Sequence, residues 1–395
     1  MRTCPKRLGA LCLALFSWTS AAQASPYRLR GDALVQLRDP SGVLALDGRG
    51  EVTPELGVEV MMWGAAGGVD GAPNPEADLL VAALSYRDAL GRGEVRAGRL
   101  VVTSGALWPV HMDGIVATGR LPTRTSLEVF GGIPVVPRFG TRAFDWAIGG
   151  RLAQSFGNST VGLGYLQERT AGMLDRHELG LDMALFPVES FDLGARAALD
   201  LARLGLAELV GTAAYTRGLW RLEAYGSHRE VSHLLPATSL FTVLGDQAQT
   251  GFGGRVEVRA APRLLVAASG GARVFDTKTY EDFLVMGRLM LGPERGSGSV
   301  GLELRRQGAP LGGWTGARAF ARFPIIEHLS GAVELELVHP DVQDRGDWWP
   351  WALISASWQF LPSWELSAAA EANASAASQR SFDAILRLSY LWSDV

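Results

Sequence analysis

The stretch Y27-R-L-R-G-D-A-L-V-Q-L-R-D39 decides the fold, because its side chains alternate between two kinds. The odd positions carry Tyr27, Leu29, Gly31, Ala33, Val35 and Leu37. The even positions carry Arg28, Arg30, Asp32, Leu34, Gln36 and Arg38. A period of two residues is typical of a β-strand, whose successive side chains point to opposite faces. The stretch therefore predicts a strand with one apolar and one polar face.

The same alternation continues to the end of the chain. It recurs over residues 191–201, 220–224, 255–259, 299–305, 329–337, 364–371 and 382–392. A half-buried sheet of a soluble protein would alternate too. However, few continuous apolar strands or amphipathic helices are available to cover such a sheet, and the alternating segments have the length of about 10 residues that a tilted strand needs to cross a bilayer. We therefore expect an all-β fold, a single closed antiparallel transmembrane β-barrel.

Ten short turns divide this barrel into hairpins. Seven contain proline, at Pro54, Pro122, Pro187, Pro262, Pro293, Pro324 and Pro362, and three are marked by glycine, at 88–92, 155–158 and 216–219. Proline suits a turn because it fixes φ and cannot donate to a sheet. Ten turns between hairpins predict about 22 strands, within a range of about 18–22.

Longer connections fall between the short turns. They are predicted at 65–77, 104–113, 132–141, 170–176, 229–247, 276–281, 307–313, 339–347 and 373–380. Membrane barrels place short turns on the periplasmic side and longer loops on the extracellular side. Both termini are therefore expected in the periplasm.

Aromatic residues near the strand ends agree with a membrane barrel, because such residues form girdles at the two interfaces. They are Trp63, Trp348, Trp349, Trp351, Trp358, Trp364, Tyr390 and Trp392. The final segment, F382-D-A-I-L-R-L-S-Y-L-W392, resembles the C-terminal assembly signal of bacterial outer-membrane proteins, although three residues follow the terminal aromatic. The chain thus resembles the porin-like outer-membrane β-barrels along residues 25–395. This resemblance implies location in the outer membrane of a Gram-negative bacterium, with membrane lipid, lipopolysaccharide and the barrel-assembly machinery as partners.

In this fold the apolar series faces lipid and the polar series faces the lumen, since an arginine facing lipid at mid-membrane costs roughly 2–4 kcal/mol. The predicted lumen-lining residues are Arg28, Arg30, Asp32, Gln36, Arg38, Asp192, Arg196, Asp200, Arg221, Glu223, Arg255, Glu257, Glu303, Arg305, Glu334, Glu336, Glu365, Glu371, Asp383 and Arg387. Three residues, Leu34, Arg99 and Ile385, break the alternation and are candidate bulges or lumen-packing positions.

The first 24 residues have the features of a signal peptide. Basic residues lead into an apolar stretch too short to span a membrane, and Ala22-Gln23-Ala24 forms a cleavage site; an N-terminal anchor helix is the alternative. Both cysteines, Cys4 and Cys12, lie in this segment, so the mature chain has no thiolate site or disulfide. It would carry 34 basic and 41 acidic residues, a net charge of −7 that argues against a nucleic-acid partner.

Nothing in the sequence predicts catalysis, a cofactor or a metal. Enzymatic barrels resemble small barrels whose sites combine histidine with serine or aspartate, and a local structural role is the simpler interpretation of His111, His177, His228, His233, His328 and His339. Asp341, Asp344 and Asp347 could form a calcium site, but solvated loop carboxylates are the more economical interpretation.

Two loops offer functional hypotheses. The loop at 229–247 is unusually apolar, and it is either an inward-folded constriction, with His233, Leu235, Leu240 and Phe241 as candidates, or an extension of its flanking strands. The segment D347-W-W-P-W351 either stacks on sugar rings or lies at the membrane interface.

A barrel of this size without an N-terminal plug domain is similar in plan to the outer-membrane barrels of polysaccharide export. Mixed arginine and carboxylate residues in the lumen disfavour strong ion selection and suit neutral polar cargo. We therefore expect a translocation pore for a polar polymer such as an exopolysaccharide, acting with a periplasmic export protein. The alternatives are a passive diffusion porin for small polar solutes and a structural or anchoring barrel of a cell-envelope machine.

Overall fold

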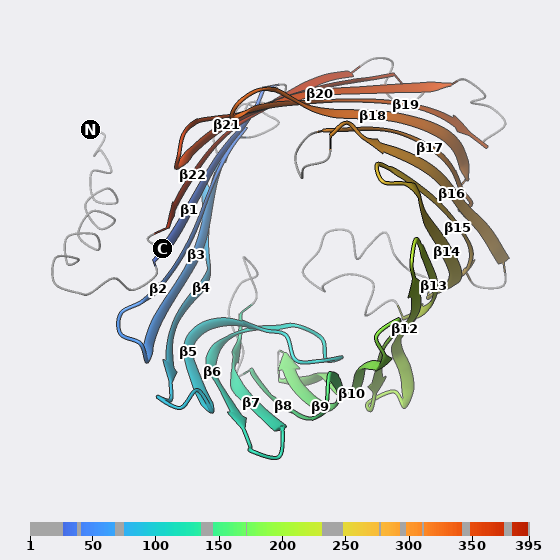
Figure 1. Cartoon of the computed structure of the whole chain (residues 1–395). Coiled ribbons are helices and arrows are strands. Elements are labelled where there is room, and N and C mark those ends of the chain that lie inside the picture. The colour runs from blue at the N-terminus through green and yellow to red at the C-terminus, as the bar shows by residue number, and fades with distance from the viewer. Residues whose placement is uncertain are drawn as a thin grey trace, which may run out of the picture.

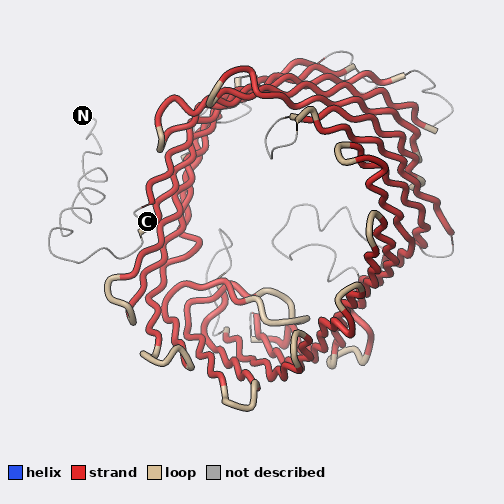
Figure 2. Tube along the Cα trace, in the orientation of Figure 1, coloured by secondary structure: helices blue, strands red, loops and turns tan. Residues whose placement is uncertain are grey.

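The protein is a closed barrel of 22 antiparallel strands (Figures 1 and 2). The computed structural model describes residues 27–37, 41–67, 75–135, 145–170, 172–230, 248–275, 278–292, 298–309, 312–341, 348–374 and 381–393. The strands are β1 Arg28–Gln36, β2 Ser41–Glu51, β3 Leu56–Gly67, β4 Glu76–Arg87, β5 Gly93–Val102, β6 Val110–Arg120, β7 Thr125–Pro134, β8 Trp146–Phe156, β9 Ser159–Thr170, β10 Met173–Val188, β11 Phe191–Asp200, β12 Gly205–Arg217, β13 Trp220–Arg229, β14 Gln249–Ala261, β15 Leu264–Phe275, β16 Lys278–Met290, β17 Ser299–Gln307, β18 Trp314–Ile326, β19 Leu329–Pro340, β20 Trp349–Leu361, β21 Trp364–Asn373 and β22 Ser381–Ser393. The expected fold and strand number are confirmed.

The opening stretch forms β1, which closes the barrel. It pairs with β2 on one side and with β22 on the other, so that Asp32 lies opposite Ala45 and Ser389. Because every strand has two neighbours, the sheet has no free edge strand. A sheet must be closed to cross a bilayer, because no water is present there to bind the backbone N–H and C=O groups of an edge strand.

The turn pattern of the sequence is confirmed, since ten connections join each even-numbered strand from β2 to β20 to the next strand. In the three glycine-marked turns, Gly91, Gly157 and Gly218 have φ between 58° and 65°. Glycine fits there because the left-handed conformation costs other residues more. Two proline positions differ from the prediction. Pro187 and Pro324 lie within β10 and β18, next to register shifts, where a residue without an N–H is tolerated.

The two faces of the sheet are unlike. One face presents apolar side chains that are unusually exposed, including Leu302 at 55%, Leu335 at 56% and Ile354 at 61%. The other face carries the charged side chains that alternate with them. No helix among the described residues is long and apolar enough to cross a membrane. Residues 1–24, predicted to be a signal peptide, lie outside the described residues.

Aromatic rings gather at the turn end of the last strands and β1. The ring centroids of Trp364 and Tyr390 lie 4.7 Å apart, and those of Trp358 and Phe360 lie 5.6 Å apart. The Trp392 ring stacks on the ring of Tyr27, which precedes β1. Such a cluster is typical of an interfacial girdle. Trp349 and Trp351 differ from the girdle prediction. They alternate with Pro350 and share the face of Ser355 and Ser357, the polar face.

One connection packs against the inside of the wall. Residues 103–109, which join β5 to β6 and which we call the strap, fold onto the polar-side face of β8, β9 and β10. Figure 2 shows this loop within the outline of the barrel. Leu107 is 5% exposed, and its side chain lies over Gly164 and Gly180, where an added Cβ would come within 2.9 Å and 3.1 Å of it. Glycine on these strands thus makes the room that the strap occupies.

Candidate pore lining

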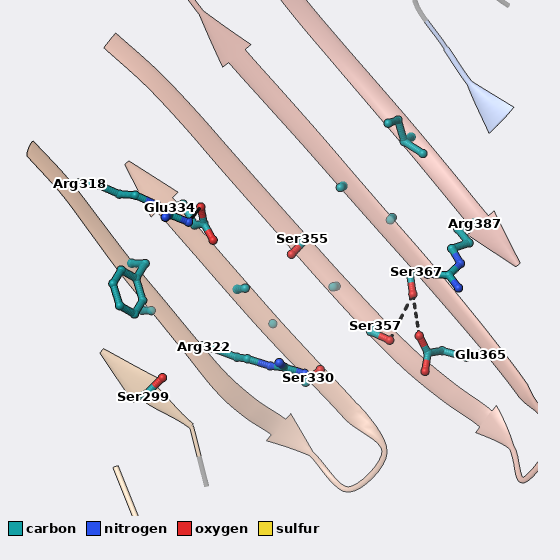
Figure 3. Close-up of a pocket in the computed structure, with 18 of the residues that line it drawn as sticks. Ser299, Arg318, Arg322, Ser330, Glu334, Ser355, Ser357, Glu365, Ser367 and Arg387 are labelled. Carbon is teal, nitrogen blue, oxygen red and sulfur yellow. Dashed lines mark hydrogen bonds and ion pairs between the residues drawn. The ribbon is translucent and has the colours of Figure 1, made fainter. Parts of the chain in front are cut away.

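A hollow of about 700 Å³ lies on the polar face and is shared by the eight neighbouring strands from β16 through β22 to β1 (Figure 3). Residues of eight successive strands can line one hollow on the concave, inner side of a closed barrel, because the strands curve around it there. We therefore propose that the polar face lines the lumen. Leu34 and Ile385 line the same hollow, and neither register involving β1 shifts at these residues. Both residues therefore pack on the polar face and are not bulges.

Charges on this face pair across strands. On β17–β19, Arg305 lies 2.8 Å from Glu336, and Arg318 contacts both Glu334 and Glu303. In a wet, partly exposed setting each such pair contributes only about 0–1 kcal/mol. Their larger consequence is electrostatic, because each of these cations has a carboxylate next to it and the pairs add little net charge to the wall.

The strands that close the barrel carry a cluster of polar side chains around Asp32. The Asp32 carboxylate accepts hydrogen bonds from Arg387 at 2.6 Å, from Ser389 at 2.7 Å and from Arg30 at 2.8 Å. Four residues further along the same face of β1, the Gln36 side-chain amide donates to the Asp383 carboxylate. The polar edge of the opening stretch is thus bonded to the polar edge of the last strand.

Other predicted lining residues also meet partners. Arg221 lies within 4 Å of Asp192 and Glu223, and Arg255 lies 3.2 Å from Glu257. The remaining contacts are Arg196 with Glu208, Glu365 with Ser367 and Glu371 with Trp351, while Arg28 lines a small recess beside Arg30 and Arg387.

One predicted lining residue has a different role in the structure, and five other predicted site residues lie outside the described residues. The Asp200 carboxylate accepts from the N–H groups of Ala202 and Arg203, so it caps a turn and does not project from the wall. Arg38 and the constriction candidates His233, Leu235, Leu240 and Phe241 lie outside the described residues. The flanking strands β13 and β14 end at Arg229 and begin at Gln249.

Two charged residues of the same face, Glu208 and Arg318, were not singled out from the sequence. Glu208, 6% exposed, accepts from both Arg196 and Arg229. Arg318 joins two carboxylates. Each of these two residues is a single charge between apolar neighbours, A-E-L and A-R-A, so the alternation that identified the others would have found them.

Half-buried tryptophans lie among these charges. The Trp351 indole N–H donates to Glu371 at 3.3 Å. The Arg305 guanidinium lies over the ring of Trp314, 5.6 Å from its centroid. Trp351 and Glu336 are opposite each other in the β19–β20 register. Aromatic rings and paired charges therefore form one row across β17–β21.

The strap has its own anchors. The Trp108 backbone N–H donates to Glu178, a carboxylate residue that is 2% exposed, and Arg176 lies over the Trp108 ring at 5.1 Å. Gly105 has φ 55°, and an added Cβ would collide with Asp182. These contacts fix the strap against the wall of β8–β10. The sequence placed this connection among the outward loops.

The histidines among the described residues have local contacts. His111 bonds the Leu80 carbonyl, His177 the Tyr165 hydroxyl and His228 the Thr250 hydroxyl. His328 lies 3.5 Å from Glu327, and His339 packs on Trp348.

The calcium hypothesis finds no support at Asp341. Its carboxylate accepts from Arg306 at 2.5 Å, and that hydrogen bond lowers the pKa of Asp341 below its usual range. Asp344 and Asp347 lie outside the described residues. Within the part of the chain that the structure describes, no group of three His, Cys, Asp or Glu could hold a metal ion.

Comparison with known proteins finds the fold but no sequence family. No protein-family model matches the chain, and no curated protein matches it. The P pilus usher PapC translocation pore superposes with a TM-score of 0.51 at 9% identity, over 94% of this chain and 99% of that chain. The siderophore receptor PirA from Pseudomonas aeruginosa gives 0.60 at 11% identity, over 94% and 81%. The chain has the fold of a bacterial outer-membrane β-barrel.

A third solved structure agrees. A mutant of the ferric enterobactin receptor PfeA from Pseudomonas aeruginosa gives a TM-score of 0.59 at 9% identity, over 94% of this chain and 81% of that chain. At these identities the likeness concerns architecture.

Proposed function

We propose that the protein is a translocation pore of the Gram-negative outer membrane for uncharged polar cargo, with a polysaccharide as the first candidate. The observation that carries the proposal is the composition of the polar face, which combines paired charges with half-buried tryptophans. Paired charges give little selection between anions and cations. Flat aromatic rings beside carboxylates suit sugars, which offer one apolar face and hydroxyl donors.

A polysaccharide exporter would work with a periplasmic partner protein, as the sequence led us to expect. The P pilus usher, a structural neighbour, is itself a translocation pore. A passive porin for small sugars would use the same lining without a partner. The exporter and the porin would therefore have the same pore lining and would differ in whether a periplasmic partner protein binds the barrel. The third hypothesis, a structural barrel, does not explain why Trp314 and Trp351 lie among the paired charges of the polar face.

Conductance tests the lining directly. The purified protein in a planar bilayer should conduct with a reversal potential near zero in a salt gradient. Glu336→Gln should shift the potential toward anion selectivity and Arg305→Gln toward cation selectivity, because each leaves one partner of a pair uncompensated. Strong selectivity of the unaltered protein would contradict the paired lining, and absence of conductance would remove the passive porin.

Sugar block tests the cargo. Added oligosaccharide should reduce the current, and Trp351→Ala should weaken that block about tenfold, because a lost stacking partner is worth on the order of 1 kcal/mol or more. Trp358→Ala is the matched control, since Trp358 lies in the same strand on the apolar face and is 49% exposed. Equal block in both variants would contradict a sugar site at Trp351. Deleting the gene separates the two functions, since an exporter's loss removes surface polysaccharide while synthesis continues.

A further inference from the structure

The backbone ladder between β4 and β5 is incomplete. Only Ala82–Arg87 of β4 pair with Glu94–Arg99 of β5, whereas β5 pairs with β6 along its whole length. The ladder stops at Arg99. The preceding residue, Gly98, has a φ of 127°, and an added Cβ there would lie 2.1 Å from the Ala82 carbonyl oxygen. Beyond this point β5 and β6 curve toward the interior (Figure 1). The half of the seam nearest the strap is thus not closed by backbone hydrogen bonds.

Side chains close that half of the seam. The register of β4 against β3 shifts near Leu80, between Val81 and Leu79. The Leu79 carbonyl accepts from the Arg99 guanidinium at 3.0 Å, and the Leu80 carbonyl accepts from the His111 imidazole at 2.7 Å. An unsatisfied backbone group in lipid costs several kcal/mol, so these contacts replace the missing ladder. Unlike a ladder, they can be released by rotation of two side chains.

Arg99 also lies on the apolar face. On the same face, Val95 of β5 and Ile115 of β6 are 43% and 54% exposed. Its guanidinium donates two hydrogen bonds to the Asp113 carboxylate, at 2.8 Å and 3.2 Å. Asp113 of β6 is paired with Ile133 of β7, whose side chain is 48% exposed. Charges on a lipid-facing surface are expensive, and where they persist they mark functional positions.

The inner side of this half of the seam carries an apolar cluster, next to a pocket that Glu59 and Arg96 also line. Val81, Leu100, Val102 and Met112 form a cluster in which each residue is at most 8% exposed, and Leu80 packs against it. The apolar cluster behind the seam and the apolar surface in front of it are therefore separated only by side chains.

We propose that this half of the β4–β5 seam is a lateral opening, held shut by Arg99 and His111, through which the acyl chain of a single-chain amphiphile passes from the bilayer into the barrel. The proposal rests on the membrane placement in the proposed function. An acyl chain fits the seam because both sides are apolar, and a carboxylate head group would meet the Arg99 guanidinium at the rim.

Photo-crosslinking tests the opening. The protein is placed in vesicles containing a diazirine-bearing palmitic acid, irradiated and mapped by mass spectrometry. Outer-face Leu302 and Leu335 should be labelled in every variant. Inner-face Val81 and Val102 should be labelled in the unaltered protein, and severalfold more in Arg99→Ala. The inner face of β12, represented by Ala214, should stay unlabelled.

A disulfide supplies the decisive variant. Ala82 and Arg99 are register partners, so the pair Ala82→Cys/Arg99→Cys can lock the seam when oxidised and leave it without its latch when reduced. Oxidation should abolish labelling of Val81 and Val102, and reductant should restore it. The control pair Leu304→Cys/Ala317→Cys joins a continuous ladder on the apolar face, and its oxidation should change nothing. No cysteine occurs after residue 12 to interfere.

The outcomes separate the two proposals. Labelling of the outer face without labelling of Val81 or Val102 in any variant would overturn the lateral opening, as would inner labelling that persists in the oxidised pair. Absence of labelling on Leu302 and Leu335 would instead contradict the membrane placement on which the proposed function depends. A shift of gel mobility on heating confirms that each variant is folded.

Discussion

At the scale of single residues, the polar face works through partners on neighbouring strands. Asp32 is the clearest case, because its carboxylate accepts from three side chains, two of them on the strand at the far end of the chain. The side chain is 15% exposed, so its partners are only partly screened by water. Asp192 contrasts with it, since it is 43% exposed and lies 3.8 Å from the Arg221 guanidinium.

This difference predicts unequal costs of removal. Asp32→Ala should lower the free energy of unfolding by about 1–3 kcal/mol, because it leaves the Arg387 guanidinium without its acceptor. Asp192→Ala should cost less than about 1 kcal/mol, as exposed ion pairs do. Urea unfolding in vesicles, followed by tryptophan fluorescence, measures both. Equal costs would show that the closing cluster adds no more than an ordinary surface pair.

At the scale of elements, the strap depends on glycines that lie far from it in sequence. Gly164 and Gly180 have no side chain, and the Leu107 side chain fills the space above them. Glycine weakens a strand interior, so its presence at these places is explained by the close approach of another segment. The space above Gly164 and Gly180, which we call the trough, thus exists to accommodate the strap.

Filling the trough should release the strap. Gly164→Val/Gly180→Val introduces overpacking worth about 1–3 kcal/mol. The Trp108 amide, bonded to Glu178, should then exchange its hydrogen on the order of tenfold faster or more. Gly251→Val is the control, because a Cβ there meets only ordinary contacts at 3.5 Å or more. If both variants exchanged Trp108 at the rate of the unaltered protein, the trough would not hold the strap.

At the scale of the whole molecule, closure joins residues more than 350 positions apart. Ala33 of β1 lies opposite Leu388 of β22, on the apolar face. A ladder between the first and last strands therefore closes the barrel. Closure of this kind removes the edge strands that would otherwise aggregate.

The closing register can be tested by cross-linking. Ala33→Cys/Leu388→Cys should form a disulfide under mild oxidation, because opposed Cα atoms in an antiparallel pair lie about 4.5–5.5 Å apart. Non-reducing electrophoresis of the denatured protein should show the altered mobility of a cyclised chain. Ala33→Cys/Ala384→Cys, four residues out of register, should not cross-link. Cross-linking of the second pair in place of the first would contradict the register.

Much of the fold was predictable because its causes are local. Alternation such as R28-L-R-G-D32 follows from the period of a strand, and Gly91 or Pro54 marks a turn through its own backbone preference. The strand number followed from counting these signals. The candidate site was less predictable. Asp32 and Arg387 were each expected on the polar face, but nothing in the sequence paired them, because pairing depends on register across the closing strands.

By itself, the sequence determined that this chain alternates, where it turns and which side chains share each face, because strand geometry couples neighbouring residues directly. Only the tertiary structure decided that the strap lies on β8–β10, that Trp351 joins the polar face beside Glu371, and that the β4–β5 ladder ends at Arg99. These features arise where the curvature of a closed sheet brings distant segments together. Local periodicity carries no information about which distant segment will be met.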